Sequence, residues 1–180
     1  MTFVQANQTK VPASVVDDSS GGTVAWTNPS QATDQTNGAT CTLGAGETSH
    51  FLKATQCGFT MPSGAVIEGL KVELEGKASV LALLRESTVA LCRGGAIEPT
   101  IKDFWLLTWI LTFVLKAAGE SNDIWDASWT GDDVRDSGFG VFVAVTNVGV
   151  LPATAEVRKL QITAHYNHDL SHRVMGRGVV

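Results

Sequence analysis

Acidic side chains gather in one part of the sequence, and a pair of carboxylates is what hydrolysis of a glycosidic bond requires. The members of this group are Asp123, Asp126, Asp132, Asp133 and Asp136. A catalytic pair is defined by the distance between its carboxyl groups, which the sequence does not give. Residues 130–133 (TGDD) also have the form of a helix N-cap, where the helix dipole favours acidic residues. We therefore interpret the group as a helix start and solvated loops; the alternative is a calcium-binding loop, although EF-hand spacing is absent.

Residue types that bind metals show no convincing spacing. The histidines at spacings of three and four are His165, His168 and His172. That spacing would align them on a helix, but the first falls inside a predicted strand, so a solvated or interface segment is favoured over zinc. The cysteines are Cys41, Cys57 and Cys92. They are odd in number and far apart, which predicts buried free thiols. We expect neither a metal nor a cofactor.

Sequence motifs give no support for an enzyme. The chain contains no GxSxG, P-loop or HExxH motif and no GxGxxG after a strand. Its net charge is −5 and its 13 Lys and Arg are scattered, which argues against nucleic acid as a partner. No apolar run is long enough to span a membrane. The first residues, MTFVQANQTK, lack a signal-peptide pattern, which predicts synthesis without export from the cytoplasm.

Tryptophan is the residue type that suggests ligand binding, because exposed indoles stack on sugar rings. The chain has five of them, and Trp125 and Trp129 lie four apart beside the predicted helix. In that position they would instead pack the helix onto a sheet, and large aromatics are more often core residues. We favour the core, with a carbohydrate-binding module as an alternative.

Residues 104–115 (FWLLTWILTFVL) are the most unusual segment, because a strand there would be apolar on both faces. An exposed apolar strand of this size needs a partner to cover it. This predicts a subunit interface; the alternative is a central strand buried under long loops. The predicted interface residues are Phe104, Trp105, Trp109, Leu111, Phe113 and Leu115.

Alternating apolar and polar residues, punctuated by Gly, Pro and Asn, predict an all-β chain. The expected strands are 23–27, 40–43, 50–59, 66–77, 87–93, 108–116, 139–147 and 155–166. Strand 66–77 has a slip at Gly69-Leu70 that indicates a bulge, and residues 148–153 predict a hairpin between the last two strands. One short helix begins at Thr130. The predicted fold is an antiparallel, jelly-roll-like β-sandwich over 22–167, with extended arms at 1–21 and 168–180.

Three segments of the chain share a pattern with a known group of proteins. The matching residues are Trp26, Asn28, Pro29, Ser49, Leu52, Ala54, Phe59, Pro62, Gly64, Ala65, Ile67, Gly69, Leu70, Val72, Leu74, Glu75, Trp129, Asp133, Val134, Ser137, Phe139, Gly140 and Val141. Over residues 22–167 the chain resembles an uncharacterised β-sandwich family of tailed-bacteriophage virion structural proteins. It departs from that family at 80–118, where members are polar and Gly/Ser-rich.

The resemblance implies a non-enzymatic, jelly-roll-like component of a phage particle, located in the virion, with no catalytic residues. The leading expectation is a capsid decoration (cement) protein that binds the major capsid protein, as a homo-oligomer and specifically a trimer. Flexible arms would suit such a protein, because they can become ordered on a neighbouring subunit. The alternatives are a tail component, either fibre-anchoring or receptor-binding, and a carbohydrate-binding module.

Overall fold

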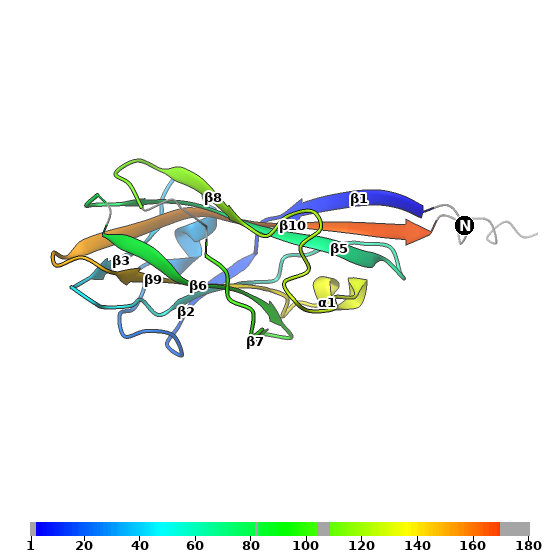
Figure 1. The fold of residues 1–180 in the computed structure, drawn as a ribbon, viewed down its shortest axis with the longest axis horizontal. Coiled ribbons are helices and arrows are strands. Elements are labelled where there is room, and N and C mark those ends of the chain that lie inside the picture. Colours follow the sequence, from blue (N-terminus) through cyan, green and yellow to red (C-terminus); the bar gives the residue numbers. More distant parts are fainter. Residues whose placement is uncertain (1–2, 82, 104–108, 170–180) are drawn as a thin grey trace, which may run out of the picture.

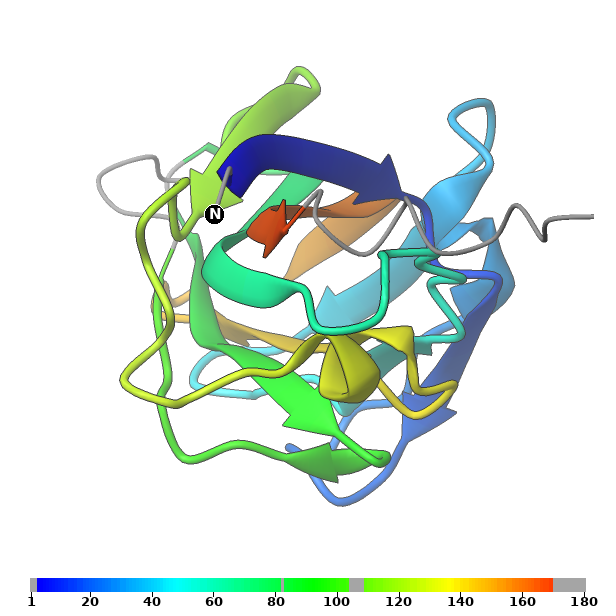
Figure 2. The same cartoon turned by 90° about the vertical axis from the view of Figure 1, so that its right-hand side faces the viewer.

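Two five-stranded sheets pack face to face, as the alternation predicted. The computed structural model describes residues 3–81, 83–103 and 109–169. One sheet, sheet A, has the order β1-β10-β5-β8, with β3 also paired to β10; the other, sheet B, has the order β2-β4-β9-β6-β7. Figure 1 shows the two layers from the side, and Figure 2 shows them end-on. All strand pairs are antiparallel, so the predicted β-sandwich is confirmed.

The strands differ widely in length. Their bounds are β1 Phe3–Lys10, β2 Ser14–Asp18, β3 Ala39–Leu43, β4 Phe51–Thr55, β5 Val66–Ala78, β6 Leu84–Arg93, β7 Ala96–Ile97, β8 Val114–Ala118, β9 Gly140–Asn147 and β10 Ala153–Asp169. A 3-10 helix, η1, covers Pro29–Thr33, and the short helix α1 covers Gly131–Arg135. Because β10 has 17 residues, one of its edges pairs with both β1 and β3 while the other pairs with β5.

Strand β5 shows how the sequence pattern sets the register. Its alternate residues Val72 and Leu74 are fully buried between the sheets, while the charged residues between them face outwards. Against β10, Ile67 pairs with Tyr166 and Gly69 with His165, so one residue of β5 is extra at this point. The bulge predicted next to Gly69 is therefore present.

The core lies between the two sheets and is mostly aliphatic, with a cluster of aromatic side chains around Phe139. Phe139 is fully buried and makes edge contacts with Phe59 and Trp129, at centroid distances of 5.9 and 5.5 Å. Burying one side chain of this size contributes roughly 1.5–3 kcal/mol. Trp26, predicted as a core residue, is buried as well.

The predicted N-terminal arm is wrong, because most of residues 1–21 belong to the two sheets. Strand β1 pairs with β10 residue by residue, from Phe3–Asp169 to Lys10–Ile162, and β2 pairs with β4. Polar residues fall on both faces of β1, so it has no apolar face in the sequence; the long β10 supplies the hydrogen-bonding edge that holds it. Strand β10 continues to Asp169, and residues 170–180 of the predicted C-terminal arm lie outside the described residues.

The predicted hairpin at 148–153 is also wrong. Strand β9 pairs with β4 and β6 in sheet B, whereas β10 belongs to sheet A. The connection therefore crosses from one sheet to the other. Its start is fixed by Asn147, whose side chain donates to the carbonyl oxygens of Leu43 and Leu151 and accepts from the Gly149 N–H.

Candidate functional site

Structural partners are present for four of the acidic residues singled out in the sequence, Asp123, Asp132, Asp133 and Asp136. Asp133 forms the predicted capping box with Thr130: its carboxylate accepts from the Thr130 N–H at 2.8 Å, and its own N–H donates to the Thr130 hydroxyl at 3.1 Å. Asp132 pairs with Arg135, and Asp136 accepts from the Gly138 N–H. The helix and loop interpretation is therefore confirmed for these three residues.

Metal-ligating residues do not converge. Within 3–81, 83–103 and 109–169 no group of three or more His, Cys, Asp or Glu side chains is placed to hold an ion. His165 and His168 both lie in β10, where an odd separation puts them on opposite faces of the strand. His172 lies outside the described residues.

The three cysteines are buried and free, as predicted. Burial raises the pKa of each thiol to about 12, so the thiolate that would bind a metal or attack a substrate does not form near neutral pH.

Four tryptophans lie in the described part of the chain, and all are core residues. The indole N–H groups of Trp26, Trp125 and Trp129 donate to backbone carbonyl oxygens at 2.9, 2.7 and 3.0 Å. None of these rings is free to stack on a sugar. The predicted packing of Trp125 and Trp129 is confirmed; Trp105 lies outside the described residues.

The apolar run is divided between the inside and the outside of the sandwich. Trp109 is fully buried and packs against Gly76, so its assignment to a surface interface is wrong. Phe113 lies under two cations, with Arg158 at 3.7 Å and Lys77 at 4.4 Å from its ring centroid. A bend at residues 111–112 separates these two aromatics, and β8 begins only at Val114, so strand alternation does not hold across 108–116.

Two other members of the run remain exposed. Leu111 and Leu115 have relative exposures of 57% and 46%. The turn at residues 148–151, which follows β9, adds Val150 at 87% and Leu151 at 59%. An interface that includes Leu111 and Leu115 stays a prediction, and Phe104 lies outside the described residues together with Trp105.

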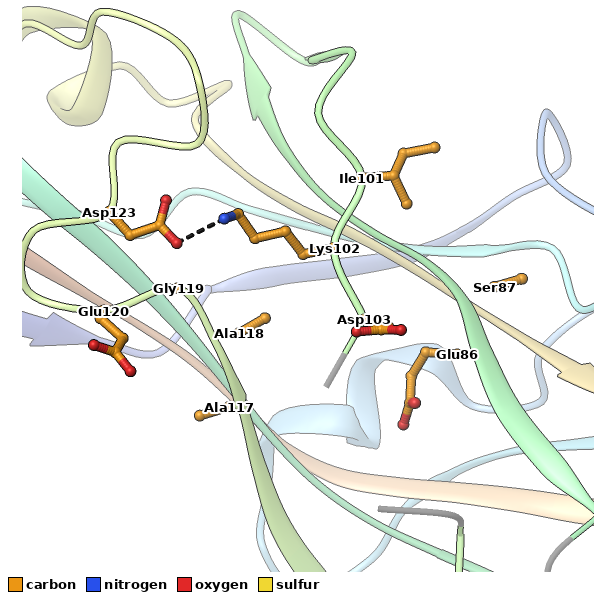
Figure 3. A pocket seen from close by; sticks show the side chains of 10 residues that line it. All are labelled: Glu86, Ser87, Ile101, Lys102, Asp103, Ala117, Ala118, Gly119, Glu120 and Asp123. Atoms are coloured by element: carbon orange, nitrogen blue, oxygen red, sulfur yellow. Dashed lines mark hydrogen bonds and ion pairs between the residues drawn. The ribbon is translucent and has the colours of Figure 1, made fainter. Parts of the chain in front are cut away.

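A polar cleft of about 640 Å³ opens along the side of the sandwich, between the edges of the two sheets. One wall is formed by β6 and the segment at Lys102, which bonds to Val89 of β6; the other is the end of β8 and the loop after it. Figure 3 shows Lys102 reaching across to Asp123, whose carboxylate accepts its hydrogen bond at 2.6 Å. Burial raises the pKa of Asp123, the hydrogen bonds from Lys102 and the Trp125 N–H lower it, and the net shift is downward.

A buried ion pair lies beside this cleft and joins the two sheets. Lys116 of β8 donates to Glu86 of β6 at 2.7 Å, and their side chains are 1% and 6% exposed. Burial lowers the pKa of Lys116, and the charge of Glu86 opposes that shift. Because Glu86 and Asp123 are each bound by a lysine, neither carboxylate is placed to act as a free general base.

A second hollow, which we call the sheet A groove, has a volume of about 290 Å³. The polar residues that line it come from β1, β5, β10 and the loop after β8, and are Gln5, Asn7, Glu68, Ser121, Asn122 and His165. Ala6 and Tyr166 complete the lining. The register places Asn7 beside His165 and His165 beside Gly69, so these three positions form one row across three strands.

Gly69 is the position that shapes this groove. A Cβ atom there would lie 2.3 Å from the carbonyl carbon of Ser121, so only glycine lets the loop after β8 cross the sheet at this height. The loop is held by a hydrogen bond from the Leu70 N–H to the Asp123 carbonyl oxygen at 2.9 Å. Its residues Ser121 and Asn122 then form a wall beside the row.

Of the residues that line the groove, only His165 was considered in the sequence, and there as a metal ligand. Gln5 and Asn7 fall in the segment expected to be an arm, and the bulge alone pointed to the neighbourhood of Glu68. Gln5 and Asn7, with Thr9, place polar side chains at every second position of β1, and this alternation is the signal that indicates an edge strand.

Comparison with known proteins identifies no family. No family model and no curated protein matches the chain. Solved structures with a similar arrangement include BiXyn10A CBM1 in its apo form, at 8% identity and TM-score 0.43, covering 93% of this chain and 97% of that chain. Another is the family 29 carbohydrate-binding module CBM29_1 from Piromyces equi, at 12% identity and TM-score 0.38, with coverage of 93% and 97%. A third is the N-terminal cellulose-binding domain of Cellulomonas fimi β-1,4-glucanase C, at 14% identity and TM-score 0.35, with coverage of 71% and 78%. Likenesses this distant give no argument about function.

Proposed function

We propose that this protein is a non-catalytic carbohydrate-binding module. The observation that supports the proposal is the sheet A groove, whose polar lining includes three carboxamides, a hydroxyl, a carboxylate and an imidazole. Sugar hydroxyls both donate and accept hydrogen bonds, and such side chains offer both functions within one small hollow. The groove lies on three strands of one sheet and a braced loop, so its side chains are held on a rigid frame.

A binding role fits this chain better than a catalytic one. The acidic side chains that would serve a hydrolase are used in a helix cap, in ion pairs and in loop hydrogen bonds. The expected affinity is low, because the aromatic ring in the lining, Tyr166, is buried and not exposed for stacking on a sugar. Three or four hydrogen bonds at roughly 1 kcal/mol each correspond to a Kd of about 1 mM or weaker.

The test is a screen of the purified chain against immobilised polysaccharides and a glycan array, with multivalent display to compensate for weak single-site binding. Binding to a defined set of glycans, competed by free sugar, is the expected result. Absence of binding to every glycan under multivalent display would refute the proposal.

A second candidate is a structural protein of a bacteriophage particle. The observation that favours it is where the family-like residues lie: Trp26, Leu52, Phe59, Ile67 and Phe139 are all buried in the sandwich. The resemblance therefore involves the residues that determine the fold, over most of the domain. A capsid decoration protein bound to the major capsid protein, as a trimer, is the leading form, and a tail component is the alternative.

The two candidates are compatible, because a particle component can also bind glycans. Quantitative mass spectrometry of purified particles decides the second one. Hundreds of copies support capsid decoration, tens or fewer support a tail component, and absence from the particle refutes both forms.

A further inference from the structure

We infer that the sheet A groove selects neutral saccharides and discriminates against those that bear a carboxylate. This inference rests on the proposed carbohydrate-binding function and specifies the ligand class of the same site. It follows from the charges in and around the groove.

The strands form one wall of the groove, and the carboxylate of Glu68 gives that wall a negative charge. Its side chain is fixed, because Asn167 donates to its Oε1 atom at 2.7 Å. Neither Lys nor Arg is among the groove-lining residues. A sugar carboxylate in the groove would therefore meet a carboxylate within a few ångströms and no cation among the lining side chains.

Among the described residues, the lysine that follows on the same strand does not compensate for this charge. Lys71 follows Gly69 on the outer face of β5, but it donates to Glu73 at 2.8 Å, so its charge is balanced locally. An anionic ligand is thus disfavoured by the carboxylate of the groove wall.

Neutral hydroxyls, in contrast, suit the polar groups of the lining. Gln5, Asn7 and Asn122 each offer a carbonyl oxygen and an NH2 group, and all three side chains are exposed. The groove is at the small end of ligand sites, which begin near 300 Å³, so it fits a single sugar unit. We therefore assign it to one neutral sugar residue of a longer glycan.

The test is an NMR titration of the full chain, labelled with 15N, with matched pairs of methyl glycosides. The pairs are methyl glucoside with methyl glucuronide and methyl galactoside with methyl galacturonide; methyl mannoside and methyl N-acetylglucosaminide extend the neutral set. We expect amide shifts at groove residues, with the preferred neutral sugar binding about three- to ten-fold tighter than its uronide at low salt.

Three variants locate and explain the effect. The double variant Gln5→Ala, Asn7→Ala should weaken neutral binding about five-fold or more. Thr9→Ala is the matched control, because Thr9 is exposed on the same face of the same strand and outside the groove, and it should leave binding unchanged. Glu68→Gln keeps the size and an acceptor oxygen but removes the charge, so it should bring the ratio of neutral-sugar to uronide affinity close to one.

The outcomes separate this inference from the proposed function. Equal or tighter binding of uronides, or shifts that map away from the groove, would overturn the inference and leave carbohydrate binding in place. Absence of saturable shifts with every sugar, combined with a negative array, would overturn both. Retained discrimination in Glu68→Gln would show that the selectivity has another origin and would also overturn the inference.

Discussion

Removing the Trp109 side chain should lower the stability of the fold, because Trp109 is a core residue and not part of a subunit interface. Its ring is fully buried, lies against Gly76, where a Cβ would come within 2.7 Å of it, and carries the Lys116 ammonium 4.7 Å from its centroid. Replacing a buried Trp by Ala costs roughly 3–5 kcal/mol, and loss of a desolvated cation–π contact adds about 1 kcal/mol. Trp109 Nε1 has no hydrogen-bond partner among the described residues, and removing that group offsets part of the cost. The net expectation for Trp109→Ala is about 4 kcal/mol.

Phe113 provides the comparison, because it comes from the same apolar run but lies outside the core. It is half-buried and held by Arg158 and Lys77, and cation–π contacts at such sites contribute about 0.5–1 kcal/mol each. Phe113→Ala should therefore cost about 1–2 kcal/mol. Leu111→Ala is the control for an exposed position and should change stability by less than about 0.5 kcal/mol.

The assay is urea unfolding followed by circular dichroism, with light scattering after size exclusion to measure the mass of the native species. Trp109→Phe serves if the alanine variant does not fold, with an expected cost of about 1–2 kcal/mol. A Trp109→Ala shift no larger than that of Phe113→Ala would refute the core assignment. So would a Trp109→Ala protein that unfolds normally but has lost its oligomeric mass.

Three further predictions concern other parts of the fold. Gly69→Ala should cost more than about 2 kcal/mol in urea unfolding, since its Cβ would meet the Ser121 backbone; a cost under about 0.5 kcal/mol would contradict the crossing of that loop. Asp133→Ala removes half of the capping box of α1 and should cost about 1 kcal/mol, measured as a lower thermal midpoint; an unchanged midpoint would show that the cap does not stabilise the fold. The hydrogen bonds from Arg158 lower the pKa of Glu75, so this carboxylate adds stability above its ordinary range near pH 4, and that stability is lost as the pH falls through its lowered value. Glu75→Gln should therefore flatten the fall in stability below pH 4, and an unaltered acid profile would contradict the pairing.

Local patterns in the sequence predicted local structure well. The bulge in β5 and the capping box of α1 were both found, because each depends on residues a few positions apart. The buried thiols and the packing of Trp125 and Trp129 followed from residue type. Each of these features is decided by a residue and its immediate neighbours.

Features that depend on pairing between strands far apart in the sequence could not be predicted from local patterns. Strand β1 has no apolar face of its own, and it is held by β10, more than 150 residues away. The turn at 148–153 has the composition of a hairpin, but whether a short connection stays in one sheet or crosses to the other depends on which strands already occupy the edges of β9. Trp109 and Phe113 are an even number of residues apart, which in a continuous strand would place both on the same face. The bend between them instead places the Trp109 ring inside the sandwich and the Phe113 ring outside.

The same distinction explains why the sheet A groove was not found from the sequence. Its lining includes Gln5, Glu68 and Asn122, which are far apart along the chain and unremarkable in type, and His165, which was considered only as a metal ligand. They meet because β10 pairs with β1 on one edge and β5 on the other, and because Gly69 lets a loop cross the outer face. The residues that resemble a virion family act inside the sandwich, whereas these act on its surface. The groove side chains Gln5, Asn7 and Asn122 are exposed, so substitutions there should change the groove with little effect on stability.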